Sequence, residues 1–145
     1  MLRLERPANM LTRLAIRNIV LIEALELEFA GGLGVLTGET GAGKSILLDA
    51  LGLVLGERGD AGLIRAGETS ASVNAEFDVT DNPAARALLA DLELADDNAL
   101  VIRRNLAADG KSRAFVNDAV VSAGTLKRLG ELLVVRHGQH DQRGL

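Results

Sequence analysis

The sequence predicts an α/β fold in which a buried strand leads through a glycine-rich loop into a helix. Three observations support this prediction: an apolar stretch at 33–37, the glycines that follow it, and a change to helical periodicity after Lys44. The apolar positions after Lys44 recur with the spacing of one broad helix face, and Gly56 and Gly59 follow as helix-ending residues. The order of strand, glycine loop and helix therefore indicates the fold class.

Alternating apolar and polar residues predict the strands outside this unit. Residues 13–29 are expected to form two strands joined by a tight turn. The range 61–79 reads as one or two strands, because "SVNAEFDV" alternates cleanly within it. Residues 98–122 are expected to form two strands joined at Asp109-Gly110, a dipeptide typical of hairpin turns, with a second turn at Asn117-Asp118.

Capping residues predict two further helices. The first helix covers 82–94, with Asn82-Pro83 supplying its N-cap and first residue. The second covers 122–133, with Ser122 available as its cap. The apolar run at 132–136 is then expected to form another buried strand.

Composition limits the class of protein. With 145 residues, 48% of them hydrophobic, and a formal charge of −4, the chain is one globular domain or a large piece of one. It has no cysteine, which excludes disulfides, thiolate metal sites and a cysteine nucleophile. No apolar run reaches the roughly 18 residues of a membrane span. We expect a cytoplasmic protein without membrane contact, a loose leader at 1–12 in which Met10 is an alternative start, and one lobe over 13–145.

The glycine-rich loop matches the pattern G-x-x-x-x-G-K-[ST] at every fixed position. Glycines allow successive backbone N–H groups to turn inward as a nest for an anion, and the helix N-terminus adds positive potential. Lys44 can reach the β- and γ-phosphates, and the Ser45 hydroxyl can ligate Mg²⁺. The loop therefore predicts binding of a nucleoside triphosphate with Mg²⁺. Its residues are Gly38, Glu39, Thr40, Gly41, Ala42, Gly43, Lys44 and Ser45.

Hydrolysis also needs a carboxylate at the end of a second apolar strand, to hold Mg²⁺ and help activate water. The apolar runs of this chain end instead in arginines, at Arg65, Arg103 and Arg136. Asp91 follows an apolar run, but it lies in a segment predicted to be helical. We therefore expect the chain by itself to bind a nucleotide and to have negligible ATPase activity.

Two other interpretations stay open at this point. The first is a free-standing P-loop kinase or hydrolase that uses an acid such as Asp91 or Asp141. The second is a nucleotide-gated association module that does not release phosphate.

Four stretches together resemble a known family: "LTRLAIRNIVLIEALELEF", "LTGETGAGKSILLDALGLVLGER", "IRRNLAADGKSRAFVND" and "VVRHGQHDQ". They are similar to the N-terminal half of the ATPase head of the RecN family. RecN proteins repair double-strand breaks in bacterial DNA and belong to the SMC-like branch of the ABC ATPases. The resemblance runs from about Met10 to Leu145. It implies a P-loop NTPase of ABC/SMC-head type, with 61–122 as an inserted antiparallel β-subdomain.

The same resemblance implies cofactors and partners. ATP and Mg²⁺ are the expected cofactors. A coiled coil and a C-terminal lobe are expected after Leu145, and that lobe would supply the remaining catalytic motifs. A second head would sandwich ATP against the first, and the complete protein would act on DNA ends at the nucleoid.

The resemblance also suggests roles for residues outside the glycine loop. The "HGQHD" stretch falls where ABC proteins have the Q-loop, so Gln139 is the first candidate for contacting Mg²⁺ and sensing the γ-phosphate. His137 competes for this role, because related heads place a glutamine directly before the glycine that corresponds to Gly138. A plain polar loop is the third interpretation. Arg17 and Asn18 are expected beside the adenine base, with an ordinary exposed strand arginine as the alternative for Arg17.

A cluster of basic residues lies on the predicted hairpin. Arg103, Arg104, Lys111 and Arg113 outnumber the one nearby acid, Asp109. Two interpretations stay open for this cluster: a patch that faces DNA, or a solvated hairpin.

Overall fold

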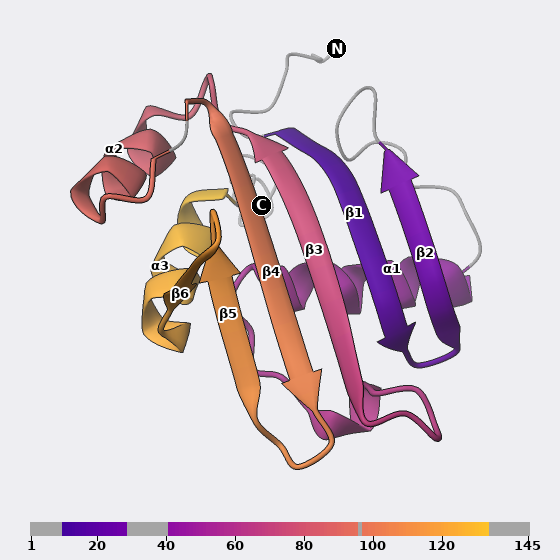
Figure 1. The fold of residues 1–145 in the computed structure, drawn as a ribbon. Helices are drawn as coiled ribbons and strands as arrows, with labels where there is room; N and C mark the ends of the chain where they lie inside the picture. Colours follow the sequence, from indigo (N-terminus) through magenta and orange to yellow (C-terminus); the bar gives the residue numbers. More distant parts are fainter. Residues whose placement is uncertain (1–9, 29–40, 96, 134–145) are drawn as a thin grey trace, which may run out of the picture.

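A six-stranded antiparallel sheet forms the centre of the computed structural model, which describes residues 10–28, 41–95 and 97–133 (Figure 1). The strand order is β2-β1-β3-β4-β5-β6. The strands are β1 Met10–Ile19, β2 Ile22–Glu28, β3 Ser70–Asp78, β4 Ala99–Ala107, β5 Ser112–Val116 and β6 Ala119–Val121. The predicted apolar strand at 33–37 lies outside the described residues.

The N-terminal hairpin forms as predicted, with β1 and β2 joined by a tight turn. However, β1 begins at Met10, so the last residues of the expected leader belong to the sheet. Leu11 is only 1% exposed and pairs with Phe77 of β3, which explains why the strand starts there. Strand β2 is the last strand at this end of the sheet, and its glutamates at positions 23, 26 and 28 are exposed.

The segment 61–79 contains one regular strand. It opens with a short 3₁₀ helix, η2 Ala61–Leu63, and a single bridge joins Ile64 to Ile19 before β3 starts at Ser70. Strand β3 then pairs along its length with β1 on one side and β4 on the other. The strands expected as an inserted β-subdomain therefore continue the sheet that the N-terminal hairpin begins.

Both turns predicted between 98 and 122 are confirmed. Strands β4 and β5 join through Asp109-Gly110, where Gly110 has a φ of 92°. Strands β5 and β6 join through Asn117 and Asp118, whose φ values of 49° and 72° are the left-handed conformations that a tight hairpin turn requires.

Within the described residues, three α-helices accompany the sheet: α1 Gly41–Val54, α2 Pro83–Asp91 and α3 Ala123–Leu133. The predicted caps are confirmed, because the Asn82 side chain accepts a hydrogen bond from the Ala85 amide, and the Ser122 hydroxyl accepts one from Thr125. The strand expected at 132–136 is wrong at its start. Leu133 belongs to α3, where it continues a buried helical stripe with Leu126 and Leu129; residues 134–136 lie outside the described part.

The hydrophobic core lies between one face of the sheet and the helices. Alternate residues of β1, β3, β4 and β5 are buried on this face, and α1 crosses behind the sheet in the view of Figure 1. The opposite face carries polar side chains, and no helix of the described ranges covers it. Within those ranges, no helix is both long and apolar enough to cross a bilayer.

Candidate nucleotide site and basic groove

The glycine loop opens onto α1. The helix begins at Gly41, so Lys44 and Ser45 lie at its N-terminal end. The first amides of a helix have no partner within the helix, and the helix dipole makes this end positive. The start of α1 is thus compatible with the anion site that the motif predicts, and binding there stays a prediction. Gly38, Glu39 and Thr40 lie outside the described residues.

The other end of α1 is closed by a glycine turn. The Glu57 amide donates to the Gly52 carbonyl over 2.9 Å, and the Gly56 amide donates to the Leu53 carbonyl over 3.2 Å. Gly56 has a φ of 101°, as expected for the left-handed residue of a Schellman cap. The prediction that Gly56 ends this helix is confirmed.

Arg17 and Asn18 lie at the end of β1, on or near the open face of the sheet. The Asn18 carbonyl accepts a hydrogen bond from the Arg65 amide over 2.8 Å, and its side chain donates to the Ser70 carbonyl over 3.4 Å. Asn18 is fixed in a left-handed conformation, with a φ of 56°. Arg17 is exposed and points away from the face that α1 covers. The described residues therefore do not bring Arg17 and α1 together, and the role at adenine stays a prediction.

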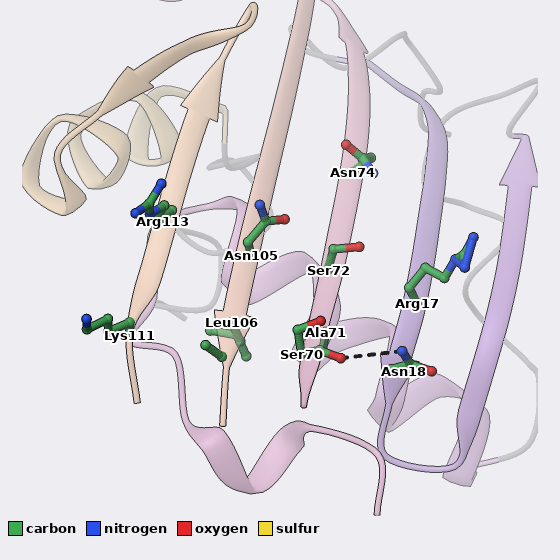
Figure 2. A pocket seen from close by; sticks show the side chains of 11 residues that line it. Arg17, Asn18, Ser70, Ala71, Ser72, Asn74, Asn105, Leu106, Lys111 and Arg113 are labelled. Atoms are coloured by element: carbon green, nitrogen blue, oxygen red, sulfur yellow. Dashed lines mark hydrogen bonds between the residues drawn. The ribbon is translucent and has the colours of Figure 1, made fainter. Parts of the chain in front are cut away.

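A groove of about 640 Å³ crosses this open face (Figure 2). Its cationic side chains are Arg17, Lys111 and Arg113, and none of its lining residues is acidic. The other lining residues come from β1, β3 and β4 and are polar or small apart from one leucine: Asn18, Ser70, Ala71, Ser72, Asn74, Asn105, Leu106 and Ala107. Such a set of donors suits an anionic ligand.

The structure divides the basic cluster of the hairpin. Lys111 and Arg113 line the groove, and the Arg103 guanidinium stacks on Phe115 with its Cζ 4.3 Å from the ring centroid. Arg104 instead points to the opposite face, where it is 4% exposed. Its inclusion in a patch facing DNA is therefore wrong, because strand alternation places neighbouring residues on opposite faces.

The model of the AAA domain matches residues 13–128. The chain belongs to the AAA domain family. This AAA domain is 44% identical to the DNA repair protein RecN of Vibrio cholerae serotype O1 over 136 residues, which are 94% of the chain and 24% of that protein. The resemblance to RecN is thereby confirmed, and the chain spans about a quarter of the length of such relatives.

Solved structures show the fold of the AAA domain. A structure of an SMC ATPase superposes with a TM-score of 0.66 at 21% identity, covering 86% of this chain and 79% of that one. The Smc head domain of Pyrococcus furiosus, with an extended coiled coil and bound to the C-terminal domain of ScpA, gives the same TM-score at 20% identity. The superposition covers 86% of this chain and 33% of that one. The expected SMC-head type of P-loop fold is confirmed.

The remaining predicted site residues of the AAA domain lie elsewhere. Gln139, His137 and Asp141 are outside the described residues. Asp91 is exposed in the last turn of α2, which packs against α3, whereas the glycine loop leads into α1.

Two features of the AAA domain were not predicted from the sequence. The first is the groove, which forms because β3 pairs with both β1 and β4 and aligns Arg17, Ser72, Asn105 and Arg113 across the sheet. The second is the burial of Arg104. A signal for it was present, because Arg104 alternates in phase with the apolar residues at 100, 102 and 106.

Proposed function

We propose that this AAA domain is the ATP-binding N-terminal lobe of a RecN-like, SMC-family ATPase. The complete protein acts in the cytoplasm, at the nucleoid, in the repair and recombination of DNA double-strand breaks. One observation carries the proposal: the pattern from Gly38 to Ser45 opens onto the N-terminus of α1. The similarity to RecN over almost the whole chain supports the repair role.

The donor set of the loop suits a magnesium-bound triphosphate. Backbone amides at the start of α1 bind phosphate oxygens, and Lys44 adds a mobile positive charge. The Ser45 hydroxyl is an oxygen ligand of the kind that Mg²⁺ prefers. Gln139 would complete the Mg²⁺ ligands, with His137 as the competing candidate, while Arg17 and Asn18 lie beside adenine.

ATP binding is proposed to join two heads. The SMC ATPase with the same fold is described with ATP-driven dimerisation and DNA-stimulated activation. In the protein that carries this chain, a C-terminal lobe supplies the acid for hydrolysis and a second head closes over the nucleotide. The chain itself supplies nucleotide binding.

The basic groove is proposed to contact DNA. Lys111 and Arg113, which have no acidic neighbour among the lining residues, fit the phosphodiester backbone together with the serine and asparagine side chains of the groove. The groove lies on the face of the sheet that α1 does not cover, so DNA would approach the domain from that face.

Equilibrium binding tests the nucleotide proposal. We expect the full-length protein to bind a slowly hydrolysed ATP analogue in a Mg²⁺-dependent manner, and Lys44→Ala to weaken that binding at least about tenfold, as expected for loss of a charge-assisted contact. Light scattering should show analogue-dependent dimers of the wild type only. Equal affinity of the wild type and Lys44→Ala would contradict the proposal.

A further inference from the structure

Arg104 is a buried cation that binds only neutral oxygens in the described structure. Its Nη1 donates to the Leu53 carbonyl over 2.7 Å and to the Glu57 carbonyl over 2.8 Å. Its Nε donates to the Ser112 hydroxyl over 2.9 Å. Burial lowers the pKa of Arg104 by desolvation, but an arginine stays protonated at neutral pH. The positive charge therefore lies at the C-terminal end of α1, where helix carbonyls favour a cation.

The turn that Arg104 binds is also held from its other side. A side-chain carbon at Gly56 would collide with the backbone of Lys127 in α3, and one at Gly130 would collide with the Leu55 carbonyl. The α1 end is therefore packed tightly between α3 and the β4–β5 hairpin. A displacement of the hairpin cannot be absorbed locally by this turn, since packed interiors transmit strain.

Ser112 connects this buried contact to the open groove. It lies between Lys111 and Arg113, two of the cations that line the groove. A ligand that pulls on these two cations moves the strand segment whose hydroxyl accepts from Arg104. The chain of contacts thus runs from the groove through Ser112 and Arg104 to the carbonyls that end α1.

We propose that Arg104 is a positioning residue for the nucleotide site, which fixes α1 against the β4–β5 hairpin and so sets the affinity of the glycine loop at the other end of this helix. The inference rests on the proposed function of the loop. The helix is a continuous 14-residue element, so a shift at its last turn is carried to Lys44 and Ser45. Removing a buried cation also changes stability, and the test must separate the two effects.

Geometry supplies a matched pair of variants. A lysine at position 104 has one ammonium that can replace Nη1 at the two carbonyls but cannot also reach Ser112. Arg104→Lys and Ser112→Ala should therefore remove the same link and weaken binding of the ATP analogue by the same modest factor, about two- to threefold. The double variant should be no weaker than either single one. Arg104→Met, which loses both links, should weaken binding about three- to tenfold.

Binding is measured on the full-length protein with Mg²⁺ and the ATP analogue, well below the melting temperature of every variant. Leu89→Ala is the control for lost stability, because Leu89 is buried in α2, which packs against α3. It should lower the melting temperature and leave the affinity unchanged. Hydrogen exchange should also show faster exchange at the end of α1 in Arg104→Met only.

Four outcomes are distinguishable. Weakened binding in the order given above supports the positioning role. Unchanged affinity in Arg104→Met with a lowered melting temperature, as for Leu89→Ala, overturns it and leaves Arg104 as a stabilising residue. If Arg104→Met does not fold, unchanged affinity in both Arg104→Lys and Ser112→Ala overturns it equally. Failure of the wild type to bind the analogue would instead overturn the proposed function of the loop.

Discussion

The side chain of Asn117 takes the place of a strand residue opposite Val101. The Val101 amide donates to Asn117 Oδ1 over 2.8 Å, and the Asn117 amide donates to the Val101 carbonyl over the same distance. Asn117 Nδ2 also donates to the Leu94 carbonyl over 2.7 Å. One residue therefore closes the turn between β5 and β6 and fastens the segment after α2 to the sheet.

Asn117→Ala is expected to lower the free energy of unfolding by about 1–3 kcal/mol, because it leaves the half-buried Val101 amide and Leu94 carbonyl without their partner and puts alanine, which has no side-chain hydrogen bond, at positive φ. Chemical denaturation measures the change. Asn117→Asp keeps the acceptor for Val101 and loses the donor to Leu94, so it should cost less than the alanine variant. Equal losses in the two variants would show that the acceptor contributes little.

Asn82 is expected to contribute stability through both ends of its amide. Its Oδ1 caps α2 at the Ala85 amide, and its Nδ2 donates to the Leu132 carbonyl of α3 over 2.9 Å. Asn82→Ala should therefore lower the free energy of unfolding by about 1–3 kcal/mol. Asn82→Asp keeps only the cap and should therefore lose less of the free energy of unfolding than Asn82→Ala. An alanine variant as stable as the wild type would contradict a stabilising role for these two hydrogen bonds.

Gly56→Ala should destabilise the protein more than Gly67→Ala. Both glycines have positive φ, 101° and 88°, so both substitutions carry a backbone penalty of about 1–2 kcal/mol. The new methyl at Gly67 meets open space, whereas at Gly56 it meets the backbone of Lys127. The difference in melting temperature isolates the packing of α3 on the end of α1. Equal shifts would show that this packing adapts at little cost.

DNA binding by the groove should depend on salt through its cations. Removing Lys111 and Arg113 by alanine substitution should lower the slope of log affinity against log salt by about 2, close to one per lost phosphate contact. Arg128→Ala removes the same kind of charge from the exposed surface of α3 and should leave the slope unchanged. Fluorescence anisotropy with a labelled oligonucleotide over a salt series measures this. A similar decrease of the slope in Arg128→Ala would indicate a non-specific effect of charge.

The chain of residues 1–145 is expected to show no steady ATP turnover, because none of its apolar runs ends in a suitable acid. Phosphate release is the measurement, with Lys44→Ala defining the background. In the full-length protein, Asp91→Asn should turn over ATP at the wild-type rate, since Asp91 is an exposed residue of α2. Loss of turnover in Asp91→Asn would favour the free-standing hydrolase instead.

The sequence predicted local structure well wherever a single residue controls the backbone. Asp109-Gly110 identified its turn, Asn82 and Ser122 identified the helix starts, and Gly56 identified a helix end. Each of these positions acts through its own φ angle or a short-range hydrogen bond, so the information lies within a few residues.

Long-range pairing was not predictable in the same way. Strand alternation indicates that Arg103 and Arg104 face opposite sides and puts Arg104 on the apolar side, but it does not say which strands align beside them. The alignment depends on β3 pairing with β1, although residues 20–69 lie between the two strands. The groove is a consequence of this pairing. The site could therefore be predicted as a motif, but its surroundings required the structure.

Within the described residues, the outermost strands of the sheet are β2 and β6. The first carries exposed glutamates and the second is only three residues long. Both features disfavour pairing with a strand of another molecule. These borders protect the domain against edge-to-edge aggregation. If ATP joins two copies as proposed above, we expect them to meet through their loops and helices, so that they can separate again without breaking a β-ladder.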